Sequence, residues 1–228
     1  MANLLAGRRR RDTLSDCCTP NGYRWVFSER SAQTEARGYR RRGLDGTSRR
    51  IVDFLKRQGV EGRTLLEVGG GIGAIQIELL KAGAERATSI ELTPTYEVVA
   101  GQLLEEAGLS GRVERKVMDF AQAAEQVAAA DIVVMNRVLC CYHDMPRLAG
   151  AAADHTLRTL VMTYPRRAPW LRAGLGIGNG LLWLTRRHFH LFVHRPSDII
   201  ATSERHGLRP VLNETGLLWT LAALSRAS

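Results

Sequence analysis

A run of glycines directly after a short apolar segment limits what this chain can fold into more than any other feature. The segment Thr64–Val68 is Thr-Leu-Leu-Glu-Val, and it continues as Gly69-Gly-Gly71-Ile-Gly73 before a stretch rich in Ile and Leu. The first piece is typical of a buried strand, and the stretch after the glycines is typical of a helix. A strand–glycine–helix turn lets backbone approach a ligand closely and points helix N–H groups at it. The pattern therefore predicts a ligand site on an α/β fold.

Helix-like and strand-like segments alternate from Thr47 onward, as in βαβ units. Thr47 and Ser48 are expected to cap the helix before the first strand. Strands are expected near residues 64–68, 87–92, 113–118, 131–135 and 159–163, with two further runs near 209–213 and 218–224. We predict an α/β fold, a doubly wound, seven-stranded, mostly parallel sheet with a C-terminal antiparallel hairpin.

Length and composition fit one large domain with an extension. The chain has 228 residues, 45% of them hydrophobic, which is enough to bury a core without a disulfide framework. Residues 1–40 have little hydrophobic periodicity, so we predict a basic, partly disordered N-terminal extension followed by a domain over residues 41–228. Residues 164–195 are long for a connection and are predicted to form a lid insertion.

Positive charge is concentrated at two flanks of this chain, whose formal net charge is +9. Residues 1–50 contain twelve Arg and five acids, and residues 158–209 contain nine Arg and two acids, while residues 51–157 are net acidic. This favours a cationic or neutral cofactor at the centre and an anionic partner at the flanks. Only three of the 32 basic residues are Lys, and an Arg bias of this kind also arises from genome composition.

Two cofactor classes use a glycine turn of this kind. Gly69, Gly71 and Ala74 satisfy the dinucleotide pattern G-x-G-x-x-G/A. Glu91, 22 residues after Gly69 at the end of the second strand, is suited to bind ribose hydroxyls in either class. No Lys of the chain has a Tyr four residues before it, so the catalytic pair of short-chain dehydrogenases is absent. A nicotinamide-dependent oxidoreductase stays the less favoured alternative.

The glycine turn resembles motif I of the class I S-adenosylmethionine-dependent methyltransferases. Asp119-Phe120 after the third strand is similar to the adenine-binding pair of that family, and the C-terminal hairpin to its last two strands. The resemblance extends over about residues 45–228 and implies a Rossmann-like transferase that uses S-adenosyl-L-methionine. The residues expected to hold this cofactor are Glu67, Gly69, Gly71, Gly73, Glu91, Asp119, Phe120 and Asn136.

Methyl transfer from a sulfonium depends mostly on alignment and the exclusion of water. A general base is needed only when the acceptor is a protonated hydroxyl or amine. Ligands of open α/β sheets lie beyond the carboxyl ends of strands, which makes Tyr142 and His143, after the fourth strand, the candidate catalytic residues. The alternatives are that His143 caps or packs against the next helix and that Tyr142 is a wall of the pocket.

The predicted lid contains the candidate acceptor-binding residues Arg166, Arg167, Trp170, His190 and His194. An apolar stretch bracketed by arginines suits an acceptor with apolar bulk and acidic groups. The local sequences around Tyr164 and His194 are distantly similar to the magnesium-protoporphyrin O-methyltransferases, which esterify a propionate. We therefore expect a small, anionic, partly apolar acceptor; the alternative is a surface helical hairpin with a basic rim.

Nucleic acid is the main alternative partner. The runs Arg8–Arg11 and Arg40–Arg42 suit a nucleic-acid-binding or RNA-modifying protein, although few of the 14 aromatic residues lie near them. The most apolar window, residues 173–184, has about half the roughly 20 residues that a spanning helix needs, so only peripheral membrane contact stays open.

No metal site is predicted from the cysteines and histidines. Cys17-Cys18 and Cys140-Cys141 are adjacent pairs with poor geometry for one tetrahedral ion, and the histidines near His190 have no Cys or carboxylate beside them. We interpret the cysteines as reduced thiols, which indicates a cytoplasmic protein.

Overall fold

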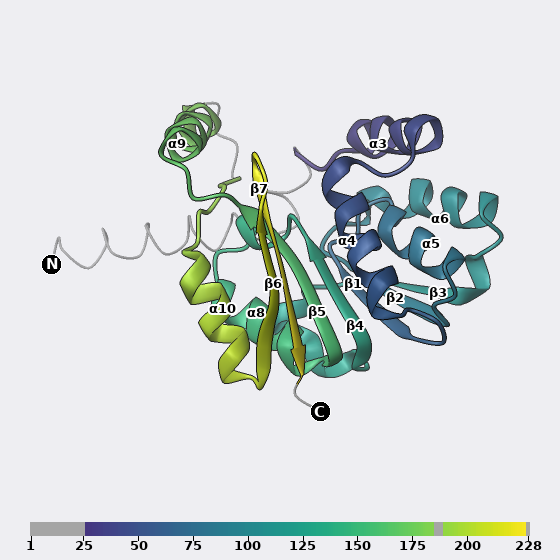
Figure 1. Cartoon of the computed structure of the whole chain (residues 1–228). Coiled ribbons are helices and arrows are strands. Elements are labelled where there is room, and N and C mark those ends of the chain that lie inside the picture. Colours follow the sequence, from purple (N-terminus) through teal and green to yellow (C-terminus); the bar gives the residue numbers. More distant parts are fainter. Residues whose placement is uncertain (1–25, 185–188, 227–228) are drawn as a thin grey trace, which may run out of the picture.

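Seven strands form one sheet in the computed structural model of the chain, which describes residues 26–184 and 189–226. Its order is β3-β2-β1-β4-β5-β7-β6 (Figure 1). The strands are β1 (Thr64–Val68), β2 (Arg86–Glu91), β3 (Val113–Val117), β4 (Ala130–Asn136), β5 (Thr156–Pro165), β6 (Leu208–Thr215) and β7 (Trp219–Arg226). The first five are parallel and the last two pair antiparallel, so the predicted sheet and hairpin are confirmed.

Helices cover both faces of the sheet. On one face lie α4 (Gly46–Gln58), α5 (Ala74–Lys81) and α6 (Glu97–Glu106); on the other lie α7 (Phe120–Ala123), α8 (Met145–Asp154) and α10 (Pro196–Arg205) (Figure 1). Successive strand residues point to opposite faces, so Leu65 packs with α4 and α5, while its neighbour Leu66 packs with α8. Two apolar cores therefore sandwich the sheet.

The strand order reverses at β1, which is paired with β2 on one side and β4 on the other. Open α/β sheets bind ligands at the carboxyl ends of the strands beside such a reversal. The glycine turn follows β1 directly, so the topology brings it to this point.

Helix α4 begins two residues earlier than the sequence suggested. Its N-cap is Asp45, whose Oδ1 accepts hydrogen bonds from the N–H groups of Thr47 (2.9 Å) and Ser48 (3.2 Å). The prediction that Thr47 and Ser48 cap this helix is wrong, because a carboxylate two residues upstream already accepts both N–H groups. The Ser48 hydroxyl instead donates to Asp45 Oδ2 (2.8 Å).

Helix α3 (Glu29–Arg42) spans residue 40, where the sequence suggested a domain boundary. Ala32 and Ala36 are fully buried, and Tyr39 Oη donates to Glu78 of α5 (2.6 Å). Arg40 forms an exposed ion pair with Glu106 of α6 (2.6 Å). The helix is therefore packed onto the same body as α5 and α6. The predicted disorder of the first residues and the pair Cys17-Cys18 lie outside the described residues.

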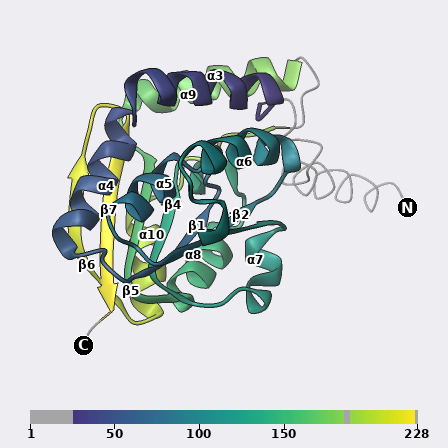
Figure 2. The ribbon, with the colours of Figure 1, turned by 90° about the vertical axis from the view of Figure 1, so that its right-hand side faces the viewer.

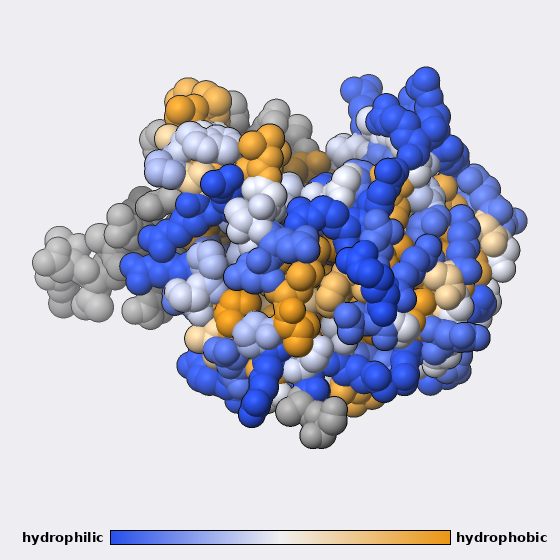
Figure 3. Space-filling model, in the orientation of Figure 1, coloured by the Kyte–Doolittle hydropathy of each residue, from blue (hydrophilic) through white to orange (hydrophobic). Residues whose placement is uncertain are grey.

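Helix α9 (Pro169–Leu184) lies in the segment predicted to be a lid. Figures 1 and 2 both show α3 and α9 above the end of the sheet at which the parallel strands finish. Trp170, Ile177, Leu181 and Leu184 are exposed on α9, and Figure 3 shows this apolar surface. None of the helices in the described ranges is both long and apolar enough to cross a membrane. A lid role for α9 stays a prediction.

Candidate functional site

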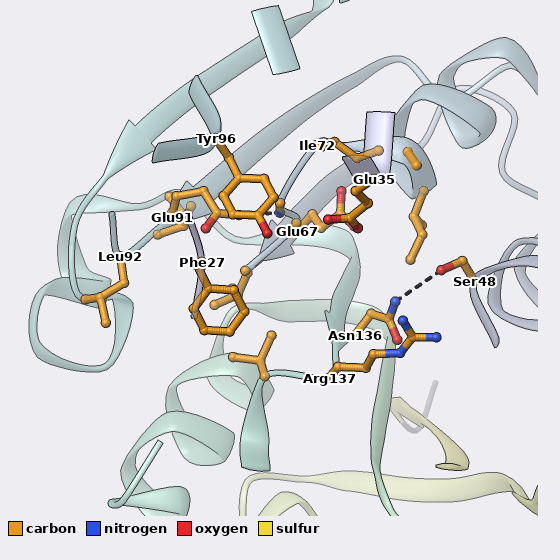
Figure 4. Close-up of a pocket in the computed structure, with 18 of the residues that line it drawn as sticks. Phe27, Glu35, Ser48, Glu67, Ile72, Glu91, Leu92, Tyr96, Asn136 and Arg137 are labelled. Carbon is orange, nitrogen blue, oxygen red and sulfur yellow. Dashed lines mark hydrogen bonds between the residues drawn. The ribbon is translucent and has the colours of Figure 1, made fainter. Parts of the chain in front are cut away.

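A cavity of about 640 Å³ lies at the carboxyl ends of β1, β2 and β4. This volume is within the roughly 300–1,000 Å³ of small-molecule sites. Seven of the eight predicted cofactor residues line it; Gly73 is the exception, since it is the N-cap residue of α5 behind the turn. Figure 4 shows the wall that Glu67, Glu91, Tyr96 and Asn136 form. The structure therefore brings the sequence-predicted residues to one place.

Glycine is required in the turn for two different reasons. The backbone is left-handed at Gly69 (φ 68°), Gly71 (φ 58°) and Gly73 (φ 78°), a region that L side chains avoid. A Cβ at Gly69 would also stand 2.6 Å from Val138 Cγ2, whereas one at Gly71 would meet Tyr96 only at 3.4 Å. The turn at Gly71 is thus open toward the cavity.

Arg115 of β3 holds this turn from behind. Its Nη2 donates to the Gly71 carbonyl (3.2 Å), its Nη1 donates to Ser89 Oγ (3.2 Å), and it forms an ion pair with Glu97 (2.8 Å). On the other side, the Gly71 N–H donates to Glu91 Oε1. Both backbone polar groups of Gly71 are therefore fixed by side chains from neighbouring strands.

Three carboxyl groups point into the cavity. Glu67 is 3% exposed, and burial raises its pKa to about 8. The negative charge of Glu91 raises this pKa further, whereas the positive charge of Arg115 lowers it. Burial also raises the pKa of Glu91 to about 7, although the hydrogen bond from the Gly71 N–H and the charge of Arg115 both lower it. The third group is Glu35 of α3, whose pKa burial raises as well. Among the described residues, Glu67 Oε2 has no hydrogen-bond partner. Such a wall favours a ligand with positive charge and hydrogen-bond donors.

Asp119 and Phe120 form the end of the cavity beyond β3. Asp119 caps α7 by accepting from the Ala121 N–H (3.1 Å), and both of its carboxylate oxygens lie 3.0 Å from Tyr142 Oη, which donates to them. Phe120 is buried with its ring edge-on to His155. Tyr142 therefore lines the cavity at this end, as the pocket-wall alternative predicted.

His143 lies outside the wall of the cavity. It is exposed, and its ring stacks on that of Tyr142 with centroids 5.5 Å apart. Asp144, not His143, is the N-cap of α8, since its Oδ1 accepts from the Arg147 N–H (3.2 Å). The capping alternative for His143 is thus wrong. Catalytic roles for Tyr142 and His143 stay predictions.

The end of β4 is fixed by α4 and β5. Asn136 Nδ2 donates to Ser48 Oγ (3.2 Å), and its Oδ1 accepts from Thr163 Oγ1 (2.8 Å). Arg137 is the only non-glycine residue in the described part with a left-handed backbone (φ 63°). Its guanidinium pairs with Asp45 (2.7 Å) and lies over the Trp219 ring. Such conformations persist only where surrounding contacts hold them.

A second cavity of about 310 Å³ lies between α9 and the segment after it. Arg167 and Arg195 face it together with apolar residues, and Asn179 ties its walls by bonding both the N–H (2.9 Å) and the carbonyl (2.8 Å) of Leu191. Arg167 was among the residues predicted to bind the acceptor, whereas Arg195 was not.

The other predicted acceptor residues are dispersed. Arg166 and Trp170 are exposed, His190 accepts from Asn179 (3.3 Å), and His194 Nε2 donates to the Tyr142 carbonyl (2.9 Å). None of the five predicted acceptor residues, all within the described ranges, lines the larger cavity. The described residues contain no cluster of three His, Cys, Asp or Glu that could hold a metal ion.

Known proteins are similar to parts of this chain, although no protein-family model matches it. The chain is 29% identical over 94 residues to the ribosomal protein L11 methyltransferase of Actinobacillus pleuropneumoniae, a match that covers 41% of this chain and 31% of that protein. It is 31% identical over 71 residues to the human EEF1A lysine methyltransferase 2, covering 31% of this chain and 30% of that protein. The chain thus spans less than a third of the length of these curated relatives.

Solved structures match most of the chain. Magnesium protoporphyrin IX methyltransferase from Synechocystis PCC 6803 with bound S-adenosylhomocysteine (SAH) superposes with a TM-score of 0.66 at 20% identity, covering 79% of this chain and 82% of that one. An O-methyltransferase family protein from Burkholderia thailandensis gives a TM-score of 0.64 at 23% identity, covering 80% and 57%. The resemblance predicted from the glycine motif is confirmed: this chain has the Rossmann-like fold of the S-adenosylmethionine-dependent methyltransferases.

Proposed function

We propose that the protein is an S-adenosylmethionine (SAM)-dependent methyltransferase acting on a small acceptor that is anionic and partly apolar. The observation that carries the proposal is the glycine turn between Glu67 and Glu91, open to a cavity of about 640 Å³ in a chain with this fold. The unpartnered Oε2 of Glu67 and the space above Gly71 fit a ligand that brings hydrogen-bond donors and positive charge.

Different residues of the cavity are suited to bind each part of the cofactor. Glu91 is suited to accept from ribose hydroxyls, Asp119 and Phe120 to hold the adenine, and Glu67 and Asn136 to face the methionine end. When bound, SAM supplies an electrophilic methyl group on a positively charged sulfur. The residues of this chain then bind, orient and exclude water, which is where most of the rate of an in-line displacement arises.

The second cavity supports the anionic character of the acceptor. Arg167 and Arg195 line it, and guanidinium groups pair with carboxylates or phosphates in bidentate geometry. Leu175, Leu191 and Val193 supply apolar wall beside them. An acceptor that is already a carboxylate loses no proton on methylation, so the reaction would need no general base.

The cofactor assignment is tested by calorimetric titration with SAM, SAH and NADH. SAM and SAH are expected to bind and NADH is not. Glu91→Ala should raise the dissociation constant by ten- to a hundredfold, about 1.5–3 kcal/mol for a charge-assisted contact. Glu85→Ala, which removes an exposed carboxylate just before β2, is the control. Binding of NADH in preference to SAM, or an unchanged affinity in folded Glu91→Ala, would refute the assignment.

The acceptor class is tested with SAM labelled in the methyl group and a panel of apolar carboxylic acids, matched amides and short RNAs. We expect label in the acids. Arg167→Ala and Arg195→Ala should each raise KM about ten- to a hundredfold with little change in kcat, since a charge-assisted pair contributes about 1.5–3 kcal/mol to binding. Arg158→Ala, on an exposed part of β5, is the control. Label in RNA alone would favour the nucleic-acid alternative.

A cytoplasmic location belongs to the same proposal. Cys140 and Cys141 are buried thiols that are not joined in a disulfide, which agrees with a reducing compartment.

A further inference from the structure

Helix α3 supplies a carboxylate to the cavity that the sequence analysis did not single out. Glu35 lines the cavity and shares a hydrogen bond with Tyr96, which lies at the end of the short helix η1 (Pro94–Tyr96). Glu35 Oε2 lies 4.0 Å from the point where a Cβ on Gly71 would stand. Figure 4 shows Glu35 beside Tyr96, with Glu67 and Glu91 around the same space.

The packing of α3 fixes the direction of this side chain. Ala32 and Ala36, on either side of Glu35 along the helix, are fully buried. Tyr39, one turn later, is tied to Glu78 of α5. Glu35 is itself exposed, and the packing of its neighbours on α3 holds it at the rim of the cavity that it lines.

The environment of Glu35 is unusual for a carboxylate. Besides burial, Glu35 and Glu91 each raise the pKa of Glu67, and Glu35 also raises the pKa of Glu91, so three carboxyl groups that repel one another when ionised share one cavity. The two arginines whose charges lower these pKa values, Arg115 and Arg137, form ion pairs with Glu97 and Asp45. Like charges brought together out of water cost free energy unless a cation joins them.

We propose that Glu35 makes the cavity discriminate between the two forms of the cofactor, favouring the sulfonium substrate over the thioether product. This inference rests on the proposed function. In the transfer, the bond between sulfur and the methyl carbon breaks, its electron pair stays on sulfur, and the carbon bonds to the acceptor. The sulfur thereby loses one positive charge, so the attraction to Glu35 is present before transfer and absent after it. Product release is then assisted by the same residue that favours substrate binding.

The expected effect follows from Coulomb's law. The carboxylate of Glu35 attracts only the charged form of the ligand, and the exposure of Glu35 to water weakens that attraction. Removing the charge should therefore lower SAM affinity about three- to tenfold, whereas SAH affinity should change by less than about twofold.

The test compares Glu35→Gln with Glu29→Gln. Both variants remove one exposed negative charge from α3, but Glu29 lies at the start of the helix and does not line the cavity. Dissociation constants are measured by calorimetry at about pH 8.5, where carboxylates are ionised, for SAM, SAH and sinefungin. Sinefungin carries an ammonium group in place of the methylated sulfonium and so keeps the positive charge without reacting. Thermal unfolding of each variant checks that α3 stays packed.

Glu35→Gln should weaken the binding of SAM and sinefungin about three- to tenfold and leave the binding of SAH nearly unchanged. Glu29→Gln should not change the affinity for any of the three ligands. An equal loss for all three ligands would overturn the inference, because Glu35 would then act only as a polar or structural contact. Unchanged affinities would overturn it as well. If the wild-type protein binds neither SAM nor SAH, the proposed function itself is refuted.

Discussion

Gly71→Ala adds a single methyl group at the most open point of the glycine turn. The new Cβ would stand 3.4 Å and 3.5 Å from two ring carbons of Tyr96 and 4.0 Å from Glu35 Oε2, all of which are cavity-lining atoms. The protein itself can accommodate this methyl group. Because it projects into the cavity, a ligand lying over the turn cannot.

The effects on folding and on binding can be separated with a matched variant. Gly108 has nearly the same backbone angle (φ 68°, against 58° at Gly71), and a Cβ there would have nothing within 4 Å. An Ala in this left-handed region costs about 1–2 kcal/mol at either position. Overfilling a packed site by one methyl group costs about 1–3 kcal/mol more, which is roughly a 5- to 150-fold rise in dissociation constant.

Chemical denaturation and SAH calorimetry test this together. Gly71→Ala and Gly108→Ala should lose similar free energy of unfolding, and only Gly71→Ala should lose SAH affinity. Wild-type SAH affinity in Gly71→Ala would show that the ligand does not lie over the turn. Equal losses of affinity in both variants would show that the loss comes from backbone strain.

Three further outcomes follow from the charges of the site. Burial raises the pKa of Glu67 from its ordinary 4.5 to about 8, so the folded protein binds more protons than the unfolded chain between these values. The free energy of unfolding of the ligand-free protein should thus fall as pH rises from about 5 to 8, and thermal scans of Glu67→Gln should show a weaker dependence on pH. A free energy of unfolding that rises over this pH range would contradict a buried, protonated Glu67. Near pH 7, SAM should release protons from Glu67 and Glu91, measured calorimetrically in buffers of different ionisation enthalpy, and proton uptake would contradict the electrostatic account. Arg115→Ala should lower the free energy of unfolding by about 1.5–3 kcal/mol and weaken SAH binding, whereas Arg57→Ala, at an exposed position, should do neither. Normal SAH binding in Arg115→Ala would refute the role of Arg115 in holding the glycine turn.

The fold could be predicted because its signals are local. A buried strand followed by the glycine turn gives the first βα unit, and the alternation after it gives the sheet. The helix α3 was missed because its buried face consists of Ala32 and Ala36, which carry almost no hydrophobic signal. Glu35 was therefore assigned to an extension and not to the site.

The residues whose positions were hardest to predict from the sequence are those held by tertiary contacts. Arg115 lies within a strand, where a charged residue normally indicates a solvent-facing position, yet it is enclosed by Gly71, Ser89 and Glu97. The candidate acceptor residues lie on both sides of α9 in the sequence; Arg167 lines the second cavity, whereas His194 is held by the Tyr142 carbonyl, a contact that no sequence pattern indicates.

A crystal structure of the protein grown with SAH tests the central claim most directly. The predicted result is SAH density above Gly69–Gly71, with the ribose against Glu91 and the adenine beside Asp119 and Phe120. SAH bound elsewhere on the protein, or this cavity filled by NADH in a competing soak, would contradict the account.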